Sequence, residues 1–109
     1  INENVLILGS GMSFHNMRSL MTGSEDKENK EKNIKFNNWL IDTFTNKKID
    51  ETQREKEITN WTNAPFARFC HPREEHLIPL FVCYGIKEDA AELVFNDNIM
   101  GQKCSAFLW

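Results

Sequence analysis

The chain has three histidines, and they lie in two short stretches of its sequence. His15 follows a glycine-rich turn, whereas His71 and His76 flank the acidic pair Glu74 and Glu75. Imidazole titrates near neutral pH and binds transition metals, so either stretch can supply acid–base catalysts or metal ligands. The spacing of His71 and His76 differs from the i, i+4 spacing that puts two zinc ligands on one helix face. We therefore expect these two histidines to have different roles.

The charged residues between these two histidines allow several interpretations. Glu74 and Glu75 could bind a metal, act as an acid–base pair, or stabilise the positive end of a following helix as first-turn carboxylates. Arg73 could bind a substrate carboxylate or form a salt bridge with the glutamates. The sequence alone leaves these alternatives open.

The sequence does not match the nucleotide-binding and nucleophile motifs that it partly resembles. The stretch 9–11 has Phe14 where a dinucleotide-binding fingerprint needs its third glycine, and it lacks the ending of a Walker loop. Ser13 is not part of a GxSxG nucleophile elbow. One structural alternative is a small zinc site with unorthodox spacings, built from Cys70, His71, His76 and Cys83.

The elements expected around the histidines are those of an α/β fold. Val5–Leu8 is a run of four apolar residues before the glycine turn, which predicts a fully buried strand. His15 then lies just beyond the carboxyl end of that strand, where open α/β sheets bind ligands.

Two helices are predicted in the first half of the chain. Apolar residues recur every four positions over 34–47, which predicts an amphipathic helix packed on the sheet. The polar stretch 23–33 before it is typical of a solvated loop or the exposed start of a helix. A capping box at 52–55 predicts a second helix over 53–61, with Trp61 as its buried anchor.

The second half predicts another helix and two strands. The apolar stretch 77–86 is bounded by proline and glycine, which favours a buried helix. The segments 92–95 and 105–109 predict two short strands, separated by a polar turn that contains 96–98 and Gly101.

Composition narrows the class of protein. The chain has 109 residues, enough for one domain at most, and 13 Lys plus Arg against 16 Asp plus Glu give a net charge of −3. This balance argues against a nucleic-acid partner. The longest apolar run, 77–86, is too short for a membrane span. Three widely spaced cysteines favour a reducing compartment, so we expect an intracellular protein of the cytoplasm or mitochondrial matrix.

Two stretches carry a resemblance to a known family. VLILGSGMSFHN (5–16) and APFARFCHPREEHLIPLFVCYG (64–85) resemble the second half of class III (LigB-type, DOPA-dioxygenase-like) extradiol ring-cleaving dioxygenases. With the closing strand at 105–109, the resemblance spans nearly the whole chain. It implies the C-terminal half of a mixed-sheet domain with flanking helices.

The resemblance also implies a chemistry and roles for residues. Such enzymes are non-haem Fe(II) proteins, with zinc possible in bacterial relatives, which bind a catechol and cleave its ring with O2. By resemblance, His76 is a metal ligand, and His15 is the acid–base residue or an additional metal neighbour. His71 and Glu75 are expected beside the ligands, and Arg73 near the substrate.

The half of the domain that carries the first two metal-binding histidines in this family is absent from this sequence. The chain also begins without methionine, so we expect a fragment that needs another chain or segment carrying that half. By itself it should be neither stably folded nor active. The alternative is a non-catalytic structural or assembly subunit of a larger complex that keeps the dioxygenase-like fold, so whether the chain is enzymatic stays open.

Overall fold

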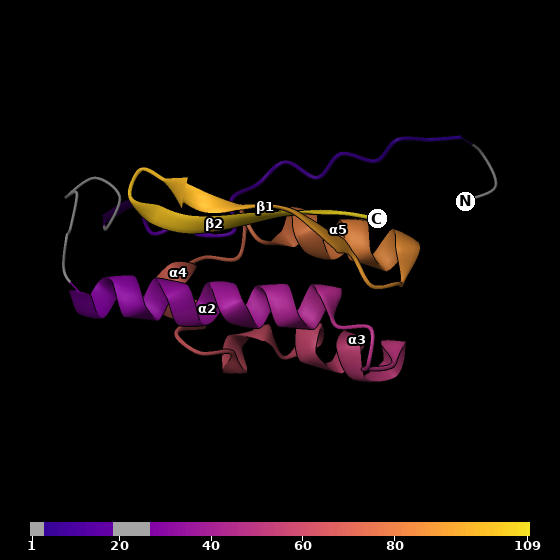
Figure 1. Cartoon of the computed structure of the whole chain (residues 1–109), viewed down its shortest axis with the longest axis horizontal. Helices are drawn as coiled ribbons and strands as arrows, with labels where there is room; N and C mark the ends of the chain where they lie inside the picture. Colours follow the sequence, from indigo (N-terminus) through magenta and orange to yellow (C-terminus); the bar gives the residue numbers. More distant parts are fainter. Residues whose placement is uncertain (1–3, 19–26) are drawn as a thin grey trace.

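The computed structural model describes residues 4–18 and 27–109, which form helices packed against a two-stranded antiparallel sheet. In chain order the elements are α2 (Lys27–Thr45), α3 (Glu51–Thr59), η1 (Trp61–Asn63), α4 (Ala67–Cys70), α5 (Ile78–Lys87), β1 (Glu92–Ile99) and β2 (Gln102–Leu108). Helix α2 runs between the β hairpin on one side and α3 on the other (Figure 1). The expected α/β class is confirmed.

Helix α2 supplies much of the core. Phe36, Leu40 and Phe44 are fully buried at the spacing that predicted the helix. The helix begins at Lys27 and not near residue 34, because the lysines and glutamates that precede its apolar stripe are good helix formers. The polar stretch is therefore the start of a helix from 27 onward, and its residues 23–26 lie outside the described residues.

Helix α3 starts at a different cap from the one predicted. Asp50 is the N-cap, and its carboxylate accepts a hydrogen bond of 2.7 Å from the Gln53 backbone N–H. The capping box at Thr52 is therefore wrong. Trp61 is buried as expected, although it lies in η1 after the helix has ended.

Arg54 ties α3 to the end of α2. Its side chain is 1% exposed and donates hydrogen bonds to the backbone carbonyl groups of Thr43 and Asn46. It also forms an ion pair of 3.0 Å with Glu51, which accepts a hydrogen bond from Tyr84 of α5. One buried guanidinium thus fixes the loop between two helices.

Helix α5 confirms the helix predicted over 77–86, with Pro79 in its first turn. The expectation that this element is buried is wrong. Ile78, Val82 and Ile86 are 43%, 53% and 40% exposed, and their spacing of four puts them on one face. No described element covers that face.

The two predicted strands form a hairpin. Strands β1 and β2 pair antiparallel from Glu92 with Leu108 to Ile99 with Gln102. The turn is Met100–Gly101, where both residues have positive φ (51° and 79°), as a two-residue hairpin turn requires. The expected turn at 96–98 is therefore wrong, because those residues lie within β1.

The predicted buried strand Val5–Leu8 is also wrong. These residues pair with no described strand, and their side chains are 51%, 77%, 40% and 83% exposed. The physical reason is that a strand apolar on both faces needs strands paired to it in a sheet, and among the described residues only β1 and β2 pair, with each other. Figure 1 shows this stretch running past the hairpin and α5.

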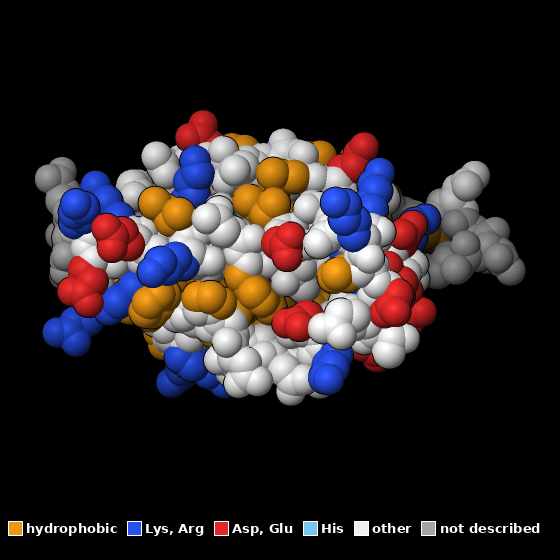
Figure 2. Space-filling view, turned by 60° about the horizontal axis from the view of Figure 1, so that its bottom comes forward, with side chains coloured by type: hydrophobic (Ala, Val, Ile, Leu, Met, Phe, Trp, Pro, Cys, Tyr) orange, Lys and Arg blue, Asp and Glu red, His pale blue; other side chains and the backbone are white. Residues whose placement is uncertain are grey.

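The core is rich in aromatic rings, whereas the surface mixes charged and hydrophobic side chains. The Phe44 ring lies 5.5–6.2 Å, centroid to centroid, from four aromatic rings, those of Phe81, Tyr84, Phe107 and Trp109. Acidic, basic and hydrophobic side chains are interspersed over the face seen in Figure 2. No helix in the described parts of the chain is long and apolar enough to cross a membrane.

Candidate functional site

The structure brings His15 and His76 together. Their imidazole rings are stacked, with centroids 3.6 Å apart and planes inclined by 16°. His15 is partly buried, whereas His76 is exposed just before α5. Two histidines from the two separate stretches of the sequence therefore lie side by side and form one candidate site.

Close backbone contact explains why the two stretches meet. The Met12 N–H donates a hydrogen bond of 3.1 Å to the His76 carbonyl oxygen. A Cβ atom on Gly11 would lie closer than 3.0 Å to the same oxygen, and one on Gly9 would lie 2.7 Å from the Pro79 carbonyl oxygen. Glycine is needed at both positions because only its backbone can approach the start of α5 so closely.

The segment that carries His15 is also fixed to the C-terminal end of α4. The His15 N–H donates to the Cys70 carbonyl oxygen at 2.8 Å, and the Asn16 side chain donates to the Phe69 carbonyl oxygen at 2.7 Å. These two bonds orient the backbone of residue 15, so its ring faces His76.

His71 lies in the core and outside the stacked pair. It is fully buried against the rings of Phe36 and Trp61, and its Nε2 lies 2.8 Å from the Ser13 carbonyl oxygen. A carbonyl can only accept, so Nε2 carries the hydrogen and donates. Burial lowers the pKa of His71 to about 4, and its Nδ1 has no hydrogen-bond partner among the described residues.

The environment of His15 favours its neutral form. Burial and the neighbouring His76 lower the pKa of His15, and a hydrogen bond to its own backbone and the carboxylate of Glu75 partly oppose this shift. At neutral pH the ring is therefore uncharged, with one nitrogen free to accept a proton.

The charged residues next to His76 lie at the surface. Arg73 pairs with Glu75 at 3.8 Å, and both side chains are exposed. Arg68 pairs with Glu74 at 3.0 Å, and its hydrogen bond lowers the pKa of that carboxyl. Exposed pairs of this kind contribute little to stability.

A complete metal shell is not present among the described residues. No group of three or more His, Cys, Asp or Glu side chains in residues 4–18 and 27–109 could hold a metal ion. The alternative of a zinc site from Cys70, His71, His76 and Cys83 is therefore wrong. Burial raises the pKa of the Cys70 thiol to about 12, which disfavours the thiolate that zinc binds.

The histidine pair fits a metal in chemical type but supplies only part of a shell. Imidazole is a common ligand of iron and zinc. A ring nitrogen directs its lone pair within the plane of the ring, and the planes of His15 and His76 are nearly parallel. The two lone pairs therefore do not converge on one point, so one of the two rings is the better candidate ligand.

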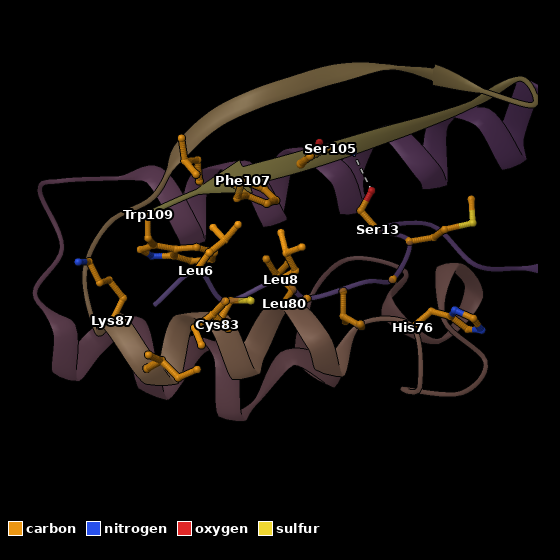
Figure 3. Close-up of a pocket in the computed structure, with 18 of the residues that line it drawn as sticks. Leu6, Leu8, Ser13, His76, Leu80, Cys83, Lys87, Ser105, Phe107 and Trp109 are labelled. Carbon is orange, nitrogen blue, oxygen red and sulfur yellow. Dashed lines mark hydrogen bonds between the residues drawn. The ribbon is translucent and has the colours of Figure 1, made fainter. Parts of the chain in front are cut away.

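An apolar groove of about 400 Å³ lies beside the site. Val5–Leu8, α5 and the end of β2 line it, and the ring of His76, at its margin, points away from the groove (Figure 3). No local pattern in the sequence indicates this groove, because it is bounded by segments far apart in the chain.

Comparison with known proteins places the chain in a class and then in a family. A helix-flanked sheet with a paired-histidine site is compatible with part of a ring-opening dioxygenase domain. A family model described as the catalytic LigB subunit of aromatic ring-opening dioxygenase matches residues 1–107. The chain therefore belongs to the LigB family, whose dioxygenases are typically metal-dependent. No curated protein and no solved structure matched it.

Proposed function

We propose that this chain is the C-terminal half of a DOPA-dioxygenase-like extradiol enzyme, which uses Fe(II) and O2 to cleave a catechol-type ring beside its two hydroxyl groups. The observation that carries the proposal is the stacking of His15 on His76 at 3.6 Å. In a LigB-family chain, this pair is the group of residues best suited to the chemistry.

His76 is the residue that we assign to the metal. Its ring is exposed just before α5, and imidazole is a ligand that both iron and zinc accept. The other ligands would come from a segment that carries the N-terminal half of the domain. When bound, Fe(II) supplies the place where the catechol oxygens and O2 meet and exchange electrons.

His15 is the residue that we assign to proton transfer. Its lowered pKa keeps the imidazole neutral at neutral pH, so it can accept a proton from a catechol hydroxyl group. The parallel stack supports this role over that of an additional ligand, because the lone pairs of His15 and His76 do not converge.

The residues around the pair have supporting roles in this proposal. His71 holds the Ser13 carbonyl group from within the core and thereby supports the segment that carries His15. Arg73 and Glu75 are exposed on the loop that leads to His76, where a substrate carboxylate can reach the guanidinium group.

Oxygen uptake with a panel of catechols tests the proposal in the intact protein. The iron-loaded wild type should consume O2 and release a ring-opened product. His15→Asn should keep its iron and lose turnover by about 10²–10⁴-fold, the usual contribution of a positioned acid–base group. Ser10→Ala, an exposed change on the same segment, is the matched control and should keep full turnover.

An iron-loaded wild type that consumes no O2 with any catechol would contradict the proposal. That result would favour the second class of function, a non-catalytic assembly subunit that retains the fold.

A further inference from the structure

Ser13 connects the histidine pair to the β hairpin. Its hydroxyl oxygen accepts a hydrogen bond of 2.8 Å from the Ser105 N–H of β2, drawn as the dashed line in Figure 3. Its carbonyl oxygen accepts a second hydrogen bond of 2.8 Å from His71. One residue, two positions before His15, is therefore held from two different directions.

The hairpin end of this connection is itself fixed to α2. The Ser105 hydroxyl donates to the side-chain oxygen of Asn37 at 2.5 Å, and the Asn37 amide donates to Asn96 of β1 at 3.1 Å. Asn37 is only 3% exposed, so solvent competes little for these bonds. A chain of hydrogen bonds thus runs from α2 through β2 to Ser13.

This connection matters because no described strand holds the segment before His15. Residues 5–8 are exposed and pair with no described strand. The place of the His15 ring therefore depends on a few local attachments: the backbone bonds of Met12 and His15, the bonds of Ser13, the bond of Asn16, and the buried side chain of Phe14. Among these hydrogen bonds, the one to the Ser13 hydroxyl is made by a side chain that precedes His15.

We propose that Ser13 is a positioning residue, whose hydroxyl group, held by Ser105 of β2, keeps His15 stacked on His76. The proposal deepens the proposed function, because it says which residue sets the geometry of the proton-transfer group. In this role Ser13 acts through the backbone of His15, two residues later in the chain.

The test is histidine-selective NMR of the intact protein, prepared without paramagnetic iron, at one neutral pH. Stacking on the His76 ring should shift the His15 ring protons upfield, and the spectrum of His15→Asn assigns them. Ser13→Ala should lose most of this upfield shift. Ser13→Cys, similar in size with a weak sulfur acceptor, should show an intermediate shift, and Ser13→Thr, which keeps the hydroxyl group, should restore it.

The melting temperature separates positioning from general stability. Each variant loses or weakens a single hydrogen bond, so its melting temperature should fall only slightly and it should stay folded. Ser10→Ala should leave the His15 resonances unchanged. Should Ser13→Ala fail to fold, the His15 shift in Ser13→Cys tests the positioning role instead, and it should be intermediate.

An unchanged His15 shift in Ser13→Ala or Ser13→Cys overturns the proposal, even if the variant melts earlier. Turnover distinguishes this failure from that of the proposed function. If the shift is lost as expected while the wild type never consumes O2, the positioning role of Ser13 is supported and the dioxygenase proposal is contradicted. If the shift is lost in Ser13→Ala and the wild type consumes O2, both proposals hold. Ser13→Ala should then lower kcat by at least about 10-fold with little change in KM, since misplacing a catalytic group affects the chemical step.

Discussion

Replacing Gly11 with alanine should separate the two histidines and destabilise the fold. The added Cβ atom would lie 3.2 Å from the His76 carbonyl carbon and closer than 3.0 Å to its oxygen. Ordinary contact begins at 3.4 Å, so the backbone must move by more than 0.4 Å (3.4 − 3.0). The neighbouring atom belongs to the backbone of His76, just before α5, and it cannot rotate away as a flexible side chain can.

The size of the effect follows from three contributions. Forcing an extra carbon into a packed contact costs about 1–3 kcal/mol. Weakening the Met12 to His76 hydrogen bond costs about 0.5–1.5 kcal/mol. Alanine restricts the unfolded chain and returns about 0.4–1 kcal/mol. Gly11→Ala should therefore lower the free energy of unfolding by about 0.5–4 kcal/mol, with about 2 kcal/mol at the centre of the range.

Urea unfolding of the intact protein measures this change, with Gly85→Ala as the matched control. Gly85 lies in α5, where an added Cβ atom would meet nothing within 4 Å, so the same substitution there should stabilise the helix by about 0.5–1 kcal/mol. The upfield shift of the His15 ring protons should fall in Gly11→Ala alone. Equal stability in both variants, with the His15 shift retained, would refute the close approach of residue 11 to His76.

The remaining predictions concern buried polar groups. His71 has a pKa of about 4 in the folded state against 6.5 when unfolded, so the unfolded state binds the proton first as pH falls. Stability should therefore decrease from pH 6.5 toward pH 4 by about 1.4 kcal/mol per unit, about 3 kcal/mol in all, and His71→Gln should remove that slope in urea titrations. Arg54→Lys should cost about 1–3 kcal/mol, since a lysine cannot satisfy the carbonyl groups that the planar guanidinium reaches. Arg68→Lys, at an exposed ion pair, is the control and should change stability little. A comparable loss of stability in both arginine variants would contradict the structural role of Arg54.

Local patterns in the sequence predicted α2, α3, α5 and the two strands of the hairpin, and failed where two local signals compete. Asp50 and Thr52 are both good N-cap residues, and only the structure shows that Asp50 accepts the Gln53 N–H. Likewise, 96–98 has strong turn residues, but the hairpin turns at Met100–Gly101, where the backbone has positive φ. Strand register sets the turn, and register is a property of the pair of strands.

Long-range packing limited the rest of the prediction. The apolar run Val5–Leu8 has the composition of a buried strand, but the sequence does not show whether another strand pairs with it. In the structure no described strand does, and the run is exposed. The histidines were recognised as chemically competent, but their stacking depends on a close backbone approach that spacing does not reveal. Asn37 lies next to Phe36 on the apolar side of α2, and a polar residue on a buried face is the signal that could have indicated its bonds to the hairpin.

The metal content of His76→Ala tests the assignment of His76 to the metal most directly. The intact wild type and the variant would be loaded with Fe(II) without oxygen, desalted and analysed for iron per chain, with His15→Asn as the comparison. We expect His76→Ala to lose its iron while its melting temperature without metal stays close to that of the wild type, because the exposed His76 ring contributes little to packing. His15→Asn should keep its iron. Unchanged iron in His76→Ala would remove His76 from the metal site and contradict the proposed function of the histidine pair.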